Sequence, residues 1–284
     1  MTKNNYDHNV IDDFGNEWEQ YDQSSVNSKE LERQFSEYFK VFSWNKKITN
    51  GVGADFGCGT GRWANFVANK VNFLICIDAS TKAVSVAKKN LVDKKNCYVV
   101  QGMIDGLPIL DDSLDFAYSL GVLHHMPDTE RAIKSCVSKL KPGAPLLLYL
   151  YYAFDNRPFW YLLIWKCTDI VRKFISKLPF YLKKFLTNFI AIFVYFPLAR
   201  LSFFLEKIGV NISNIPLSEY RKKSFYTMRT DSLDRFGTRL EQRFTKENIE
   251  KMMKNSELEN ISFSNTAPYW CVVGYKKNEY NLPD

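Results

Sequence analysis

The chain has few of the residues from which disulfide scaffolds and metal centres are built. Its 284 residues include six cysteines and three histidines, and the cysteines form no C-x-x-C pair. Metal sites need such ligands at short, regular spacings, and disulfide-rich domains need a higher density of cysteine. The sequence therefore predicts reduced thiols, a cytoplasmic location and no metal ligands.

Long apolar segments are also missing. The first residues, M-T-K-N-N-Y-D-H-N-V, lack the apolar centre of a signal peptide, so we expect none. The longest apolar run, 185–199, contains Asn188 and Pro197 and is shorter than the roughly 20 residues that a bilayer crossing requires. We therefore expect no membrane-spanning helix.

The composition is that of a folded protein whose charge is concentrated in one segment. Hydrophobic residues make up 46% and charged residues 24% of the chain, which argues against disorder. The formal net charge is +7, and nine basic residues against three acidic ones lie between 155 and 210. Because the excess is local, we interpret it as a property of that segment and not as a chain-wide nucleic-acid surface.

The most informative motif is a glycine-rich turn followed by a carboxylate. Residues 52–61 read V-G-A-D-F-G-C-G-T-G, and Asp78 follows Gly57 by 21 residues, at the end of a second apolar run. Glycines let the backbone approach a ligand closely, and the ends of parallel strands lie side by side at one sheet edge. An acid at this spacing can accept both hydroxyls of a ribose, so the motif predicts a ligand that contains a nucleoside.

Four stretches, in the same order, resemble one protein family. The spacing G-x-G-x-G, with Asp55 two residues before it, resembles motif I of the class I S-adenosylmethionine (SAM) methyltransferases. Residues 101–116, 118–128 and 140–148 resemble the family's third-strand loop, post-strand-4 segment and turn into strand 5. These four motifs are similar to those of the ubiquinone-biosynthesis-like group of methyltransferases, which acts on small molecules. The resemblance is close over 50–152 and loose over 244–276.

The resemblance implies an α/β fold with a doubly wound, mostly parallel, seven-stranded Rossmann-like sheet and an antiparallel last strand. The sequence predicts strands near 52–56, 73–77, 97–101, 114–119 and 145–152. They alternate with helices predicted over about 61–69, 81–91 and 128–140, which agrees with this fold. We expect an N-terminal helical cap at 1–48 and a SAM-binding core at 49–153 and 244–284. A helical, aromatic insertion at 154–243 would follow strand 5.

The resemblance also implies SAM as the cofactor and S-adenosylhomocysteine as its product. The residues expected to contact it are Asp55, Gly57, Cys58, Gly59, Gly61, Asp78, Ala79, Met103, Ile104 and Leu120. The family often has an acid after the third-strand glycine, where this chain has Met103. Two interpretations follow: the adenine packs on Met103 and Ile104, or Asp105 takes the place of the acid.

A hydroxyl acceptor would lose its proton near the moment of methyl transfer, and a neutral imidazole suits that role near neutral pH. His125 is the first candidate for this base, followed by His124 and Tyr152. The alternative is that the two histidines only form the pocket wall.

The polar stretch 218–244 is predicted to be loop-like and to return to the ligand-binding edge of the sheet. Either it recognises the substrate or it is a solvated, salt-bridged connection. The expected substrate-binding residues are Tyr151, Tyr226, Arg229, Asp231 and Arg235.

The first part of the insertion is dense in aromatic and basic residues. One interpretation is a cover over the substrate or a homodimer interface. The other is a basic amphipathic surface on an anionic membrane, peripheral to its inner face, that meets a lipid-linked substrate.

The function favoured by these patterns is O-methylation of a saccharide or other small polyhydroxy metabolite. Methylation of an apolar or lipid-linked acceptor of quinone or polyketide type, and non-catalytic SAM binding, are the alternatives. No nucleic-acid substrate is expected, since S-L-G-V-L-H-H stands after strand 4 where the nucleic-acid enzymes of this family have Asn or Asp followed by P-P-Y.

Overall fold

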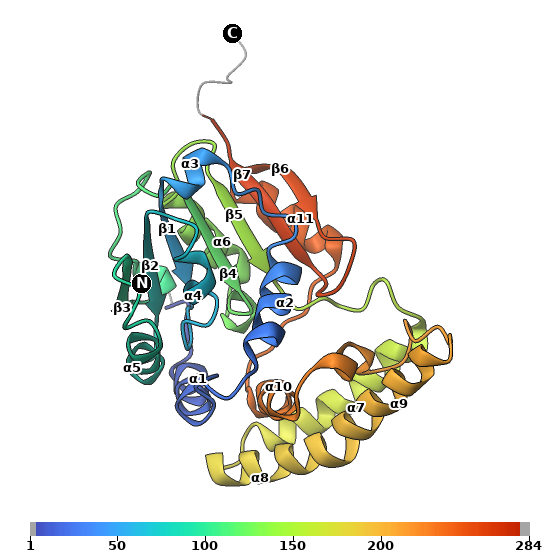
Figure 1. Ribbon diagram of the computed structural model, residues 1–284. Helices are drawn as coiled ribbons and strands as arrows, with labels where there is room; N and C mark the ends of the chain where they lie inside the picture. The colour runs from blue at the N-terminus through green and yellow to red at the C-terminus, as the bar shows by residue number, and fades with distance from the viewer. Residues whose placement is uncertain (1–3, 279–284) are drawn as a thin grey trace.

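A seven-stranded sheet forms the centre of the computed structural model, which describes residues 4–278 (Figure 1). In chain order the strands are β1 (Val52–Phe56), β2 (Phe73–Asp78), β3 (Cys97–Gln101), β4 (Phe116–Leu120), β5 (Pro145–Tyr149), β6 (Leu258–Phe263) and β7 (Cys271–Lys276). Their order across the sheet is β3-β2-β1-β4-β5-β7-β6. Strands β1 to β5 pair in parallel, and β7 runs antiparallel to both β5 and β6. The predicted fold class is confirmed.

Most of the core helices begin at a side-chain cap. Ser80 caps α5 (Thr81–Asn90), Asp128 caps α6 (Thr129–Ser138) and Thr245 caps α11 (Lys246–Asn255). Each cap oxygen accepts a backbone N–H that the first helical turn leaves without a partner. The helix predicted from about 61 to 69 is only the short α4 (Ala64–Val67), and α3 (Lys46–Thr49) precedes β1.

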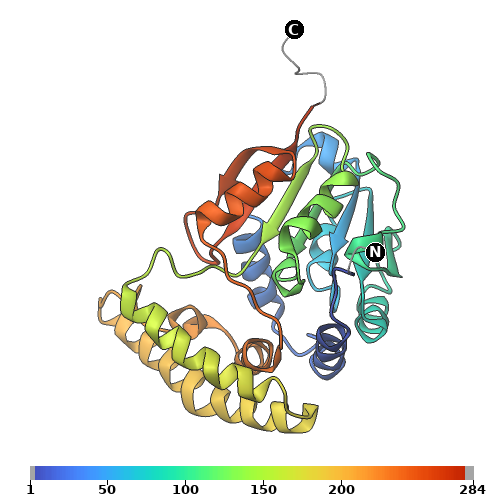
Figure 2. The ribbon, with the colours of Figure 1, turned by 180° about the vertical axis from the view of Figure 1, so that it is seen from behind.

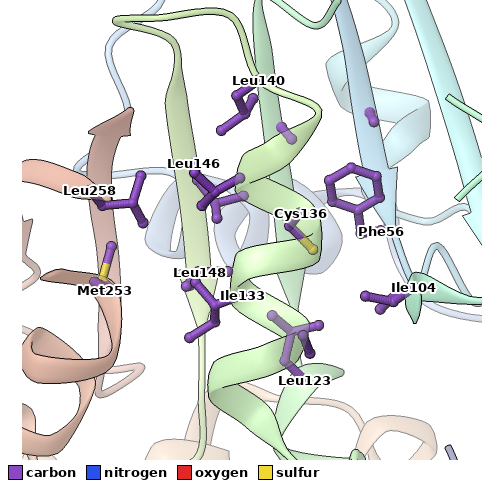
Figure 3. Close-up of a cluster of buried hydrophobic side chains, with 14 of the residues drawn as sticks. Phe56, Ile104, Leu123, Ile133, Cys136, Leu140, Leu146, Leu148, Met253 and Leu258 are labelled. Atoms are coloured by element: carbon purple, nitrogen blue, oxygen red, sulfur yellow. The ribbon is translucent and has the colours of Figure 1, made fainter. Parts of the chain in front are cut away.

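Apolar side chains are buried on both faces of the sheet. On one face, Phe56, Leu146 and Leu148 lie against Ile133 of α6 and Met253 of α11 (Figure 3). On the other face, residues of α2 (Ser28–Tyr38) and of the segment after it pack on the strands. Burial on both sides explains why the parallel strands read as continuous apolar runs.

The N-terminal helices cover the edge of the sheet at which the predicted ligand site lies. Helix α1 (His8–Gln20) packs against α5 and against α10 (Phe225–Gly237), so it joins the core to the insertion. Helix α2 carries Phe35, whose ring stacks on that of Phe39 at a centroid distance of 4.4 Å. The boundaries of the proposed cap, 1–48, and of the core segment ending at 284 extend beyond the described residues.

The insertion is a layer of helices outside the sheet. It contains α7 (Phe159–Ile175), α8 (Phe180–Ile190), the π-helix η3 (Ala191–Tyr195), α9 (Phe196–Lys207), the 3-10 helix η4 (Ser218–Lys222) and α10. The opposite views in Figures 1 and 2 both place α10 next to the core and α7 with α8 and α9 farther out. Helix α10 is therefore packed on two sides.

Helices α8, η3 and α9 form one continuous helix of 28 residues, 180–207, which we call the α8–α9 helix. By length and composition it could cross a bilayer, because the helix extends beyond the apolar run 185–199 on which the expectation of no spanning helix was based. The reason is that Pro197 does not end the helix. It stands in the first turn of α9, directly after the π-turn, where the wider winding removes the need for its missing N–H.

The segment 218–244 is not the loop that the sequence predicted. Residues 225–237 form α10, whose N-cap is Ser224 and whose Met228, Leu233 and Phe236 are buried. A helix packed on two sides buries residues around most of its circumference, so it lacks the one-sided apolar stripe by which helices are recognised. The many charged residues of this segment are held in ion pairs.

Candidate active site

The glycine turn and Asp78 meet at the carboxyl ends of β1 and β2. Gly57 has φ +81° and a side chain there would collide with Val122, while Gly59 has φ +53°. The Asp78 carboxylate accepts the Gly59 N–H and the Ser80 N–H, both at 2.9 Å. Burial raises the pKa of Asp78 above its ordinary value. The glycine turn and Asp78 are therefore held together as one unit by these hydrogen bonds.

A cavity of about 1080 Å³ extends from this turn into the insertion. Its walls come from the turn, the ends of β4 and β5, helices α1, α7, α10 and α8–α9, and residues 266–269. Pockets for a single small ligand measure roughly 300–1,000 Å³. The cavity is therefore large enough for a cofactor at the sheet edge and an acceptor beneath the insertion.

Eight of the ten predicted cofactor contacts line this cavity: Gly57, Cys58, Gly59, Asp78, Ala79, Met103, Ile104 and Leu120. Asp105 lines it as well, paired with Arg131 at 2.5 Å between Oδ2 and Nη2. Met103 stands directly before the 3-10 helix η1 (Ile104–Gly106), so both interpretations of adenine binding keep their residues at the site.

Asp55 and Gly61 are the two predicted cofactor contacts that do not line the cavity. Asp55 is buried in β1 beside Tyr118 of β4, and burial raises its pKa to about 8. Gly61, with φ +76°, faces Leu91 of the segment after α5, where a Cβ would come within 2.8 Å. A glycine is required at position 61 because the turn packs closely against Leu91, and not because a ligand approaches the backbone there.

His125 is the histidine that reaches the cavity. It lies in the 3-10 helix η2 (Leu123–His125), and its Nδ1 is 2.7 Å from the carbonyl oxygen of Leu240. A carbonyl only accepts, so Nδ1 carries the proton and Nε2 of the neutral ring is a free base. Burial lowers the pKa of His125 to about 4. The imidazole is thus neutral over the physiological range.

His124 is in a different environment. Its ring is fully buried and stacks on Tyr151 with centroids 3.8 Å apart, and it does not line the cavity. Within residues 4–278 neither ring nitrogen has a hydrogen-bond partner, and burial lowers its pKa well below the usual range. His124 therefore lies behind Tyr151, which does line the cavity, and not in the cavity wall itself.

Asp234 of α10 is the residue that sequence reasoning missed. Its Oδ1 lies 3.9 Å from His125 Nε2, and its Oδ2 accepts the hydroxyl of Tyr151. Burial, followed by the neighbouring carboxylates of Asp231 and Glu241, raises its pKa to about 7. In a helix, residues three apart such as Asp231 and Asp234 lie on the same face. Because the segment was predicted to be a loop, Asp234 was not placed beside Asp231 at the site from the sequence.

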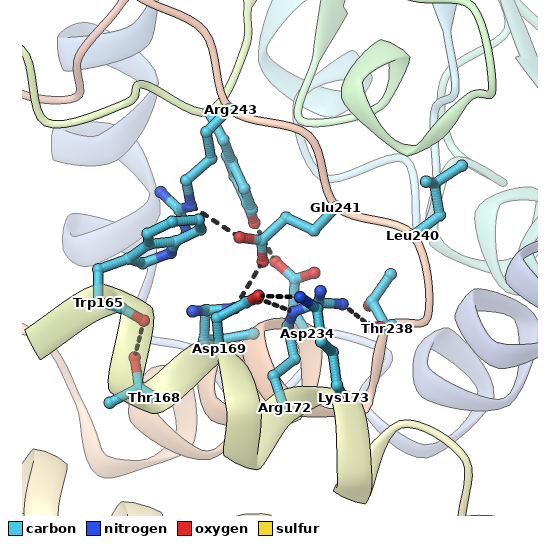
Figure 4. Close-up of polar contacts among 12 residues, drawn as sticks. Trp165, Thr168, Asp169, Arg172, Lys173, Asp234, Thr238, Leu240, Glu241 and Arg243 are labelled. Atoms are coloured by element: carbon cyan, nitrogen blue, oxygen red, sulfur yellow. Dashed lines mark hydrogen bonds and ion pairs between the residues drawn. The ribbon is translucent and has the colours of Figure 1, made fainter. Parts of the chain in front are cut away.

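A network of buried charges fixes the elements that carry this pair (Figure 4). Glu241 accepts from Arg235 at 3.0 Å and from Arg243 at 2.7 Å, while Arg172 of α7 binds Asp169 and the carbonyl oxygen of Thr238. Leu240, the acceptor of His125, lies between these anchors. The network therefore holds the imidazole orientation through the backbone at 238–243.

The predicted substrate residues divide into two groups. Tyr151, Asp231 and Arg235 line the cavity, as does Tyr152, the third candidate for the base. Tyr226 and Arg229 lie outside its lining: the Tyr226 hydroxyl accepts the Gln23 N–H, and Arg229 donates to Asn188. These two tie α10 to the N-terminal segment and to α8, so we assign them no substrate contact.

Helix α1 covers the glycine turn. Trp18 lines the cavity, with its indole nitrogen 3.2 Å from the point where a Gly59 Cβ would stand, and Phe14 packs on His125 at 4.8 Å between ring centroids. Glu17, from the same helix, is buried near Asp234, and its Oε1 has no hydrogen-bond partner in the described part of the chain.

The burial of Glu17 predicts a stability effect. Desolvation, with Asp234 and Asp231 nearby, raises its pKa well above the usual value, so the folded state binds a proton that the unfolded chain releases. Stability should then fall as pH rises above about 4.5 towards the folded pKa. We expect Glu17→Gln to raise the free energy of unfolding at pH 8 by about 1–3 kcal/mol in urea titrations, with little gain at pH 4. Glu19→Gln, exposed on the same helix, is the control, and an equal effect of both variants would contradict the prediction.

Comparison with known proteins agrees with this geometry. Residues 54–148 match the family model described as a methyltransferase domain. Phosphoethanolamine N-methyltransferase 2 of Caenorhabditis elegans is 31% identical over 100 residues, which cover 34% of this chain and 23% of the relative. The tRNA (carboxymethyluridine(34)-5-O)-methyltransferase of Saccharomyces cerevisiae is 31% identical over 103 residues, 35% of each chain. The matches thus span only a quarter to a third of these relatives.

Similarity to solved structures extends over nearly the whole chain. A SAM-dependent methyltransferase from Aquifex aeolicus aligns with a TM-score of 0.51 and 12% identity, covering 90% of this chain and 96% of that one. At this identity the likeness concerns the fold. Residues 54–148 therefore resemble a methyltransferase domain, and the whole sheet has the same fold as that SAM-dependent methyltransferase structure.

Proposed function

We propose that the protein transfers a methyl group from SAM to a hydroxyl of a small polyhydroxy molecule bound beneath the insertion. The observation that carries the proposal is the position of His125 Nε2. His125 lines the same cavity as Asp78 and the glycine turn. Its Nε2 is buried, has no hydrogen-bond partner in the described part of the chain, and lies 3.9 Å from Asp234 Oδ1.

The residues at the sheet edge fit the cofactor. Side chains at Gly57 and Gly59 would narrow the space along the turn. Asp78 lies at the end of β2, where its carboxylate would accept the ribose hydroxyls of the cofactor. SAM supplies a methyl group on a sulfonium, which is a good leaving group, so the protein needs no covalent nucleophile. Its tasks are to align the acceptor, to exclude water and to receive one proton.

His125 is proposed to receive that proton. Its Nε2 would take the hydroxyl proton while Nδ1 keeps its bond to Leu240, and the resulting imidazolium would lie beside Asp234. Tyr151 holds the other oxygen of Asp234 and so positions the carboxylate. Asp234 is a positioning and charge-stabilising residue in this scheme.

The polyhydroxy acceptor is inferred from the cavity wall. Tyr152, Tyr161 and Trp165 offer aromatic faces, and Asp231 and Arg235 offer charged groups for hydroxyls. One relative is a tRNA methyltransferase, so the comparisons alone do not establish a small-molecule substrate. That the acceptor is a small molecule is therefore part of the proposal. It is tested by incubating the protein with methyl-labelled SAM and separate panels of saccharides, polyols and tRNA. Label in tRNA alone would contradict it.

The proposed pair predicts a pH profile. Below pH about 7 Asp234 is protonated and cannot stabilise an imidazolium, whereas His125 stays neutral down to pH about 4. We expect kcat to rise at least about tenfold from pH 5.5 to 8.5, with a midpoint near 7. In the Asp234→Asn variant kcat should depend much less on pH. If kcat of this variant still rises with pH as in the wild type, a group other than Asp234 causes the pH dependence.

A further inference from the structure

The outermost helices of the insertion present a large apolar surface to solvent. We call the exposed side chains of α7 and of the α8–α9 helix the outer face. They include Leu163, Ile170 and Phe174 on α7, and Phe185, Phe189 and Phe193 on the α8–α9 helix. Phe174 is 69% and Phe185 is 65% exposed. Contiguous apolar surface of this kind is uncommon on a soluble monomer and marks an interaction site.

The outer face is accompanied by positive charge. Lys166, Lys173 and Lys177 are exposed on or just after α7, and Arg200 and Lys207 are exposed on α9. Of the three acids between 155 and 210, Asp169 and Glu206 already pair with basic residues. Exposed lysines and arginines beside an apolar helix face are complementary to the headgroups of an anionic bilayer.

The inner side of the α8–α9 helix is fixed to the protein. Lys183 pairs with Asp13 of α1 at 2.6 Å, Ser232 of α10 donates to the Thr187 carbonyl, and Tyr195 packs edge-on against Tyr220 at 5.0 Å. A spanning orientation would break all three contacts and place Lys183 in hydrocarbon. The helix can therefore lie in the plane of a membrane surface without leaving the domain.

The outer face borders the cavity along both helices. On α7, Ile164 and Val171 line the cavity and are 45% and 46% exposed; on the α8–α9 helix, Val194 lines it and is 43% exposed. Ile190, Val194 and Leu198 recur every four residues at the cavity wall, beside the stripe of Phe185, Phe189 and Phe193. An apolar chain could thus pass from this surface into the acceptor end of the cavity.

We propose that the outer face docks on an anionic lipid bilayer, and that the acceptor carries an apolar chain that remains at the bilayer. The docking does not depend on the proposed function, whereas the statement about the acceptor rests on it. The polar head of the acceptor would reach His125, and its chain would follow the apolar border of the cavity.

Docking is tested by co-sedimentation of the whole chain with vesicles. We expect binding to vesicles of phosphatidylcholine with phosphatidylglycerol at low salt, and at least about tenfold weaker binding with phosphatidylcholine alone or at 1 M salt. Wild-type protein that stays in the supernatant at low salt overturns the proposal. A stable dimer in solution that binds no vesicles also overturns it, because the outer face would then contact a second copy.

Variants locate the contact. Phe174→Ser with Phe185→Ser should weaken vesicle binding at least about tenfold, and these exposed positions should leave SAM binding unchanged. Leu110→Ser, 82% exposed on the core, is the apolar control. Lys166→Gln with Lys177→Gln should reduce binding more than Lys88→Gln with Lys89→Gln on α5. Equal effects of the test and control variants would overturn the assignment of the surface.

The acceptor is tested separately from the docking. Methyl-labelled SAM and a lipid extract are incubated with the protein, and the label is followed into organic-soluble and aqueous fractions. Label in the organic-soluble fraction supports the lipid-borne acceptor, and label only in water-soluble products overturns it. Failure of SAM to bind in calorimetry would remove the proposed function while leaving the vesicle result intact.

Discussion

Replacement of His125 by alanine is expected to lower kcat by about 10²–10⁴-fold, the range typical for loss of a positioned general base. The reason is that His125 lines the cavity with a neutral imidazole whose Nε2 carries no proton, while Nδ1 is held by the carbonyl oxygen of Leu240. SAM affinity should change little, because His125 is placed at the acceptor side of the site. The measurement combines single-turnover methyl transfer with calorimetric titration of SAM.

Two controls make the His125 result specific. His8→Ala removes the third histidine of the chain, which is exposed at the start of α1, and should leave both quantities unchanged. His125→Asn retains a group that can donate to Leu240 but offers no basic nitrogen, so it should be nearly as slow as the alanine variant. Turnover at the wild-type rate in either His125 variant would remove this residue from the proposed chemistry.

Asp78→Ala is expected to weaken SAM binding by about 10- to 100-fold. A hydrogen bond to a charged group contributes about 1.5–3 kcal/mol, which corresponds to one to two decades in affinity. Part of the loss would come from the turn itself, because Asp78 also accepts the Gly59 N–H. Calorimetry with SAM and with S-adenosylhomocysteine checks the prediction.

The control for Asp78 is Asp93→Ala, an exposed aspartate on the core away from the cavity, which should leave affinity unchanged. Asp78→Asn separates charge from shape, since the amide oxygen can still accept the Gly59 N–H. We expect it to fall between wild type and alanine. Unchanged dissociation constants in both Asp78 variants would contradict the ribose-binding role.

The regular part of the fold was predictable because its strands are marked locally. β1 and β3 match their predicted ranges, since each is a short apolar run bounded by turn residues, and Ser80, Asp128 and Thr245 mark helix starts. The position of β7 between β5 and β6 has no local signal. An antiparallel last strand was expected only because the family resemblance implies one.

The candidate site was predictable where its residues follow the motifs. Gly57, Gly59, Asp78 and His125 all line one cavity, as strand ends in a parallel sheet require. Asp55 does not line the cavity because a residue two positions before the turn still lies inside the strand. Asp234 was missed because α10 is buried by ion pairs and packing on two sides, and charged residues are usually taken as a sign of solvent.

The insertion shows that the length of an uninterrupted apolar run does not give the length of a helix. Pro197 and Asn188 suggested interruptions, yet Pro197 follows a π-turn and Asn188 faces inward to accept from Tyr21 at 3.2 Å and from Arg229 at 2.9 Å. Which side of a helix is covered depends on distant partners such as Asp13 and Ser232. Those partners are known only once the chain is folded.

The account depends most on the cofactor and the base sharing one cavity. A crystal structure of the protein with S-adenosylhomocysteine tests this directly. We expect the ribose hydroxyls within about 2.7–3.2 Å of the Asp78 carboxylate, with the sulfur facing the side of the cavity that carries His125. Density for the compound elsewhere, or a cavity closed by Trp18 with no compound in it, would contradict the account.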